Sequence, residues 1–373
     1  MGGTDSVGGL MLAGTVRVAA LAVLLCGFVV GCNQRGHQAG GASGAAGAAG
    51  DGATFDADGT AHITRVVPMP STVSPEAREW LASLTRKSNA PQTLELRRAS
   101  TDEWRARQSA EARRLFPVNL QETTTAGVRT DILTPLDAGE TNRDRVLINL
   151  HGGGFNSDSG SLIEGVPICS LARMKVVSAY YRLAPENPFP AAVDDVAAVY
   201  RELLKTYKPH NIGIFGTSAG ATLTAEVAAR LKQARTPLPG ALGMFSVHPD
   251  YTRPTDSQEL FALDGLPGSL EARDPNKPPE DAYVGNTDPQ DPVLSPLFAD
   301  LKGWPPSLLV TSTRDILLSD TAMFHRALLR AGDDAQLVVY EALPHAFWYH
   351  YQLPETREAL DVMAKFFDEK LGR

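Results

Sequence analysis

Short apolar stretches alternate with amphipathic stretches of helix length along most of the chain after residue 128. Strands are expected over residues 128–134, 145–150, 175–181, 211–215, 240–247, 307–312 and 335–341. Helices are expected over residues 191–207, 219–233, 319–331 and 355–371. Apolar strands that alternate with helices indicate a mostly parallel sheet covered on both faces. The pattern therefore predicts an α/β fold.

Two more helices are expected before the first strand. Ser74 followed by Pro75 is typical of a helix N-terminus, since proline has no amide hydrogen to leave unpaired at the first helical position. Ser100 with Glu103 matches a capping box. These helices either form part of a lid over an active site or simply pack against the sheet, and the pattern does not separate the two.

The N-terminal segment has the form of a secretory signal peptide over residues 1–31. An apolar run, VAALAVLLCGFVV, follows Arg17 and is too short to span a bilayer comfortably. It leads into VVGC, which resembles the lipobox of bacterial lipoproteins, although leucine is usual where Val29 stands. We expect lipidation of Cys32 and a lipid anchor to a membrane. The alternatives are an ordinary secretory signal and an uncleaved anchor.

Residues 32–60 are rich in glycine and alanine and have little to bury, which favours a disordered tether before a folded domain over residues 61–373. The expected location is the bacterial cell envelope as a membrane-anchored lipoprotein, or otherwise the periplasm or the medium.

Composition narrows the class of protein. The 373 residues are 43% hydrophobic, which is ample for a core, and their net charge of −8 argues against nucleic acid as a partner. Cys169 is the only cysteine in the predicted folded domain. The cysteines therefore indicate neither a disulfide framework nor a metal site. Cys169 is expected to be a small buried hydrophobe.

Two glycine-rich segments carry candidate chemistry. Residues 216–220 read GTSAG between an apolar strand and a helix, which is the context of a nucleophilic serine on a sharp turn, here Ser218. Residues 151–154 read HGGG, and backbone amides of Gly152 and Gly153, with that of Ala219, are candidates for an oxyanion hole. Together they predict a serine hydrolase.

A nucleophilic serine needs a base and an acid that orients the base. In this fold they follow the serine in the order acid, then histidine, at the carboxyl ends of later strands. Asp315 follows the strand 307–312, and His345 follows the last strand. Asp320 competes for the acid role, but capping of a helix beside Ser319 explains it adequately. The expected catalytic residues are therefore Ser218, Asp315 and His345.

Further segments carry a resemblance to a known family. The chain has YRLAPE at 181–186, FPAAVDD at 189–195, DPVLSPL at 291–297 and WPP at 304–306. With HGGG and GTSAG, these make the chain similar to hormone-sensitive-lipase-like (bacterial family IV) esterases of the α/β-hydrolase superfamily. Thr217 places it with the GTSAG branch. The chain departs from the family by Ala346, where glycine is usual, which should alter the pocket slightly.

The resemblance implies an α/β-hydrolase fold with a helical cap partly built from residues 61–120. It implies no metal and no cofactor, and it allows a dimer without deciding for one. The activity implied is that of a serine carboxylesterase acting on small-molecule esters with short- to medium-chain acyl groups. A lactonase, deacetylase or amidase would use the same triad. A ligand-binding protein on this fold is disfavoured because His345 is present.

Overall fold

The computed structural model describes residues 2, 52–84, 93–137, 142–268 and 282–372, and it separates into the units Met1–Val67 and Pro68–Arg373. The described part of the first unit is an exposed antiparallel hairpin of β1 (Gly52–Phe55) and β2 (Ala61–Thr64). The last residues of the expected disordered tether therefore form a strand and a turn. Thr54 and Phe55 favour a strand, and the turn is closed by hydrogen bonds from the Asp56 amide to the Thr60 carbonyl oxygen and from the Gly59 amide to the Asp56 carbonyl oxygen. The rest of the tether and Cys32 lie outside the described residues.

The second unit is built on an eight-stranded sheet in the order β10-β9-β8-β7-β5-β6-β4-β3. The strands from β5 to β10 are parallel, whereas β4 runs antiparallel to β6 and β3 runs antiparallel to β4. Their bounds are β3 Val118–Thr125, β4 Val128–Pro135, β5 Val146–Leu150, β6 Lys175–Ala179, β7 Ile212–Thr217, β8 Ala241–Phe245, β9 Ser307–Ser312 and β10 Ala335–Tyr340. The expected α/β-hydrolase architecture, a mostly parallel sheet flanked by helices, is confirmed.

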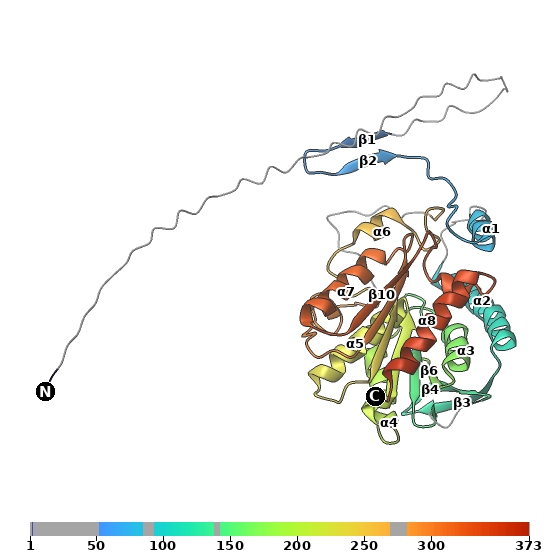
Figure 1. Cartoon of the computed structure of the whole chain (residues 1–373), viewed down its shortest axis with the longest axis vertical. Helices are drawn as coiled ribbons and strands as arrows, with labels where there is room; N and C mark the ends of the chain where they lie inside the picture. The colour runs from blue at the N-terminus through green and yellow to red at the C-terminus, as the bar shows by residue number, and fades with distance from the viewer. Residues whose placement is uncertain (1, 3–51, 85–92, 138–141, 269–281, 373) are drawn as a thin grey trace. The chain divides into compact units, whose positions relative to one another are not determined.

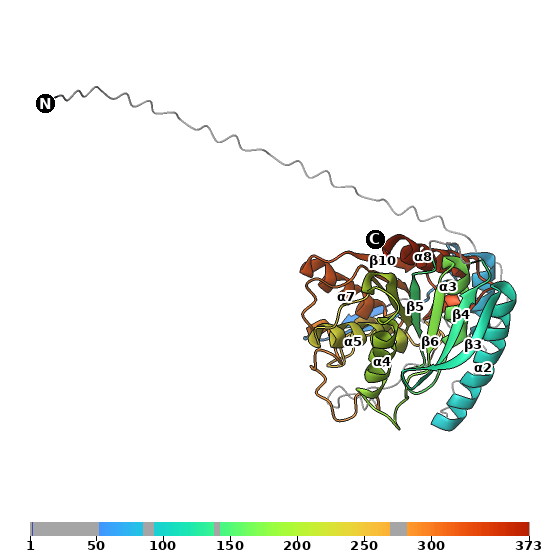
Figure 2. The ribbon, with the colours of Figure 1, turned by 90° about the horizontal axis from the view of Figure 1, so that it is seen from below.

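Helices cover both faces of this sheet (Figures 1 and 2). Their bounds are α1 Pro75–Leu84, α2 Leu94–Leu115, α3 Ser161–Ala172, α4 Ala191–Leu203, α5 Ala219–Gln233, α6 Asp256–Leu260, α7 Leu318–Ala331 and α8 Pro354–Lys370. Side chains of α4, α5 and α7 pack into one apolar core, and side chains of α3 and α8 pack into a second. Among the described residues, no helix is both long and apolar enough to cross a membrane.

The seven predicted strands are all present, but the hydrophobic pattern missed several elements, among them β3 and α3. β3 is a polar edge strand, VNLQETTT, without a buried stripe. α3 is apolar on nearly all sides and contains Pro167, so it shows neither helical periodicity nor a usual composition. Its residues from Ile163 to Cys169 are buried in the core, and Cys169 is completely buried, as expected.

The two N-terminal helices differ in how well their starts were predicted. The Ser74 hydroxyl accepts a hydrogen bond from the Ala77 amide (3.0 Å), so the expected cap is correct. The capping box at Ser100 is wrong, because α2 begins at Leu94 and Thr93 caps it. Residues 94–99 read LELRRA and are good helix formers, so the helix begins before Ser100.

Candidate active site

Ser218 lies on the sharp turn between β7 and α5. Its φ of 59° and ψ of −121° are unusual for a residue with a side chain. The turn packs directly on the end of β5. A Cβ atom on Gly216 would lie 2.3 Å from the Leu150 carbonyl oxygen, and one on Gly220 would lie 1.9 Å from it. Both glycines are therefore required by close backbone approach, and the strained turn presents the serine at the carboxyl edge of the sheet.

The glycine-rich loop after β5 lies beside this serine. A Cβ atom on Gly152 would be 3.4 Å from the Ser218 Cβ. Gly153 has a φ of +111°, and a Cβ atom on it would lie 2.2 Å from the Ser157 carbonyl oxygen. Among the described residues, no protein acceptor is recorded for the amides of Gly152 and Gly153. Ala219 begins α5, so its amide is one of those that a helix leaves unpaired. The glycine-rich loop and the start of α5 thus lie side by side at Ser218, and the oxyanion hole formed by these three amides stays a prediction.

A buried tyrosine holds the start of the glycine-rich loop. The Tyr181 hydroxyl donates to the His151 carbonyl oxygen (2.6 Å), and the two rings stack at 4.1 Å between centroids. The His151 Nδ1 atom in turn lies 2.8 Å from the Gly152 carbonyl oxygen. Tyr181 belongs to the YRLAPE segment, so that segment supports the architecture of the loop. Arg182 next to it pairs with Asp195 (2.8 Å).

Helix α2 fastens the far end of the same loop. The Arg98 guanidinium donates to the Asn156 carbonyl oxygen (2.6 Å) and to both carboxylate oxygens of Glu186 (2.7 and 2.8 Å). This hydrogen bonding lowers the pKa of Glu186 to about 2. Arg105, two turns further along α2, lies 3.7 Å from Asp158. The N-terminal helix thus contributes directly to holding the loop.

Asp315 and His345 form a buried pair. The His345 Nδ1 atom lies 2.7 Å from Asp315 Oδ1, and the carboxylate is completely buried. It also accepts hydrogen bonds from the Ser246 hydroxyl, the Thr311 hydroxyl (3.0 Å) and the Leu317 amide (2.9 Å). Burial alone would raise the pKa of Asp315, but His345, the Ser246 hydroxyl and the Leu317 amide hold it below its ordinary value. The carboxylate therefore stays ionised and orients the imidazole through Nδ1.

Asp320 is occupied elsewhere. It is buried and accepts hydrogen bonds from Thr255 and Gln258 (3.3 Å), and its Oδ1 lies 2.7 Å from His248 Nδ1. α7 begins at Leu318, so Asp320 lies within the helix and does not cap it. The proposed capping role is therefore wrong, although the structure does bring Asp315, and not Asp320, to His345.

The His345 loop lies against the serine turn through the residue that precedes the serine. The Trp348 indole donates to the Thr217 hydroxyl (2.9 Å). Among the described residues, no hydrogen bond joins the Ser218 hydroxyl to the His345 ring. Such contacts are often long before a substrate binds and shorten in the reacting complex.

The N-terminal helices also contact the segment that follows His345. The ring of Trp80 in α1 lies 4.2 Å from that of His350, and the ring of Trp104 in α2 lies 6.0 Å from that of Tyr349. Packing of these helices therefore supports the histidine loop, whatever further role they have as a cap.

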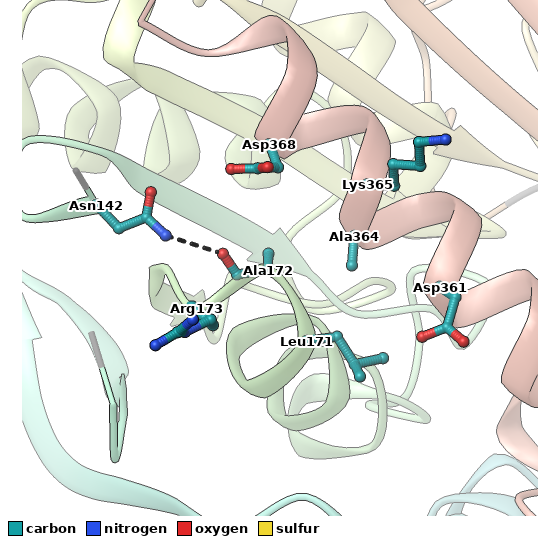
Figure 3. A pocket seen from close by; sticks show the side chains of 8 residues that line it. All are labelled: Asn142, Leu171, Ala172, Arg173, Asp361, Ala364, Lys365 and Asp368. Atoms are coloured by element: carbon teal, nitrogen blue, oxygen red, sulfur yellow. Dashed lines mark hydrogen bonds between the residues drawn. The ribbon is translucent and has the colours of Figure 1, made fainter. Parts of the chain in front are cut away.

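A surface cleft of about 380 Å³ lies near the amino ends of the parallel strands, and Figure 3 shows the side chains that line it. Asn142 lies there before β5 and donates to the Ala172 carbonyl oxygen (3.2 Å) at the end of α3. α8 supplies the other wall. Because Ser218 and His345 follow the carboxyl ends of strands, this cleft at the amino ends is separate from them.

Several residues at the site were not found from the sequence. Ser246 and Thr311 both bond to Asp315, and Glu164 bonds to Thr217. For Ser246 and Thr311, the only signal in the sequence was a hydroxyl group within an apolar strand, and it did not identify Asp315 as the partner. The sequence held no signal for Glu164.

The sheet order and the serine turn define an α/β-hydrolase. The family model for the α/β-hydrolase fold matches residues 147–349, and the chain belongs to that family. It is 34% identical over 235 residues to an acetyl-hydrolase of Streptomyces hygroscopicus, covering 61% of this chain and 77% of that one. It is 31% identical over 265 residues to an esterase of Acinetobacter venetianus, covering 68% and 84%.

Solved structures give the same result. A crystal structure of an esterase from the bacterial hormone-sensitive lipase family matches with a TM-score of 0.67 and 29% identity, covering 80% of this chain and 99% of that one. A hormone-sensitive lipase from a metagenome library matches with a TM-score of 0.64 and 30% identity, covering 79% and 98%. These relatives confirm the resemblance to hormone-sensitive-lipase-like esterases and the enzyme class, a carboxylic ester hydrolase.

Proposed function

We propose that the protein hydrolyses short- to medium-chain acyl esters through Ser218, His345 and Asp315. The observation that carries this proposal is the buried Asp315–His345 pair, held at 2.7 Å on the loop that contacts the serine turn. Asp320, the other candidate acid, pairs with His248 and not with His345.

The reaction has two halves. The imidazole of His345 takes the proton of Ser218 while its oxygen attacks the ester carbonyl, and the amides of Gly152, Gly153 and Ala219 stabilise the oxyanion. The imidazolium then protonates the departing alcohol. In the second half His345 activates a water molecule, which releases the acid and restores the serine. Asp315 stays ionised throughout and stabilises the imidazolium.

The preference for small acyl groups is supported by the Streptomyces relative, whose name describes removal of an acetyl group. An acyl pocket that fits a short chain loses binding energy steadily as methylenes are removed, and it rejects chains that do not fit. We therefore expect activity to peak at short p-nitrophenyl esters.

The test is hydrolysis of p-nitrophenyl esters from acetate to palmitate by the purified full-length chain in detergent, beside its Ser218→Ala variant. We expect turnover of short esters that disappears in the variant. If no ester is hydrolysed and a fluorophosphonate probe does not label Ser218, the protein is a binding protein on this fold. Preference for lactones or amides over all esters would also overturn the proposal.

We also propose that the chain is attached to a membrane of the cell envelope by a lipid on Cys32. The support is the VVGC sequence after an apolar run that follows Arg17. Cells that express the full chain would be treated with an inhibitor of the lipoprotein signal peptidase. Accumulation of the precursor is expected, whereas unchanged processing would mean that another signal peptidase cleaves the chain.

A further inference from the structure

A buried glutamate lies behind the nucleophile and has no part in the reaction described above. Glu164 is on α3, and its side chain is fully enclosed. The Thr217 hydroxyl donates to its Oε1 atom (2.8 Å), and the Tyr349 hydroxyl lies 3.2 Å from its Oε2 atom. The Thr217 oxygen also accepts the hydrogen bond from the Trp348 indole. These four side chains come from three distant segments and are linked by hydrogen bonds inside an apolar core, where Asn149 of β5 also bonds to Glu164.

The two ends of this network are the two halves of the candidate triad. Thr217 directly precedes Ser218 at the end of β7. Trp348 and Tyr349 lie in the short helical turn Phe347–Tyr349, one turn after His345. Glu164 therefore contacts the serine turn with one oxygen and the histidine loop with the other. No described hydrogen bond joins Ser218 to His345 directly, whereas this network links residues next to each of them.

A carboxyl group in this place is costly. Burial raises the pKa of Glu164 to about 8, although hydrogen bonds from Thr217, Tyr349 and Asn149 act in the opposite direction. None of these partners is a cation. An apolar residue would fill the space without the desolvation cost, whereas it could not accept the Thr217 hydrogen.

We propose that Glu164 is a positioning residue that sets the placement of His345 relative to Ser218 through Thr217 and Tyr349. It does not touch the substrate, and the inference rests on the function proposed above. The Thr217 oxygen accepts from Trp348, so its single hydrogen is directed to Glu164 and needs an acceptor there. Any side chain of the same length with an oxygen at this position should preserve the arrangement, and a side chain without one should not.

The test compares Glu164→Ala with Glu164→Gln. Glutamine keeps the acceptor oxygen, so we expect its kcat to stay within about threefold of the wild-type value. Alanine removes the acceptor, and a small displacement of reacting groups costs kcat about 10- to 100-fold with little change in KM. Trp348→Phe removes the indole donor while keeping an aromatic ring, and it should also lower kcat. It keeps the inference testable if the alanine variant does not fold.

Tyr200→Phe is the matched control. It removes another buried hydrogen bond, from the Tyr200 hydroxyl to the Pro237 carbonyl oxygen (2.8 Å), on the α4 side of the sheet. It should lower thermal stability while leaving kcat within about twofold, because a local loss of stability does not displace the triad. Thermal unfolding of all variants is measured alongside the kinetics.

Equal kcat in Glu164→Ala and the wild type would overturn the inference, as would a loss in Glu164→Gln as large as that in Glu164→Ala. A kcat loss in Tyr200→Phe equal to that in Glu164→Ala would reduce the role of Glu164 to general stability. These outcomes differ from failure of the proposed function, in which the wild-type chain itself hydrolyses no ester.

Discussion

The buried carboxyl of Glu164 makes stability depend on pH in a way that can be worked out. Its pKa is about 8 in the folded chain against an ordinary value of 4.5. Between these two pH values the unfolded chain has released the proton while the folded chain keeps it. Raising the pH therefore favours unfolding throughout this window. The effect is absent below about pH 4.5 and complete above about pH 8.

The size follows from the two pKa values. The difference of about 3.5, multiplied by about 1.36 kcal/mol for each pKa unit, gives about 5 kcal/mol over the whole window. A Glu164→Gln variant has no proton to lose at this position. The free energy of unfolding of the wild type, minus that of the variant, should therefore fall by about 4 kcal/mol between pH 5 and pH 8.

Urea unfolding followed by tryptophan fluorescence at pH 5, 6, 7, 8 and 9 measures this difference. All other titrating groups are shared by the two proteins and largely cancel in the subtraction. The slopes of the unfolding free energy against urea should match, so that the two unfolded states are comparable. A difference that is constant across this pH range would show that Glu164 is already ionised in the folded protein, and the reasoning would be wrong.

Asp315→Asn should lower kcat on p-nitrophenyl butyrate about 10⁴-fold, since it favours the wrong imidazole tautomer; Asp320→Asn should cost far less, and the reverse order would exchange their roles. Gly220→Ala should lower the free energy of unfolding by about 3 kcal/mol or more, because its Cβ would lie 1.9 Å from the Leu150 carbonyl oxygen. An unchanged melting temperature would contradict this. Arg98→Gln should lower kcat/KM about fivefold by loosening the glycine-rich loop. Its effect on stability should stay under about 1 kcal/mol, because the ion pair of Arg98 with Glu186 is partly exposed. Unchanged kinetics would mean that the loop keeps its conformation without Arg98.

Most of the fold could be predicted from the alternation of apolar strands and amphipathic helices along the sequence. Buried parallel strands read as continuous apolar runs, so the seven predicted strands were found within a few residues of their bounds. The GTSAG turn was equally clear, because a serine between two glycines that follows an apolar strand and precedes a helix is the local signature of a nucleophile turn. Such features depend on neighbours in the sequence or on a general rule of the fold, and the amino-acid order determines them alone.

Other features were decided only by the tertiary structure. β3 is an exposed edge strand and α3 is apolar on nearly all sides. Neither therefore shows the hydrophobic periodicity by which a strand or helix is predicted. The partner of His345 depends on which carboxylate meets it in space, and Asp315 and Asp320 are nearly equivalent along the chain. Glu164 meets Thr217 across 53 positions and Tyr349 across 185. A hydrogen bond between such distant residues exists only after the sheet has assembled, because side-chain packing, and not local sequence, brings its two atoms together.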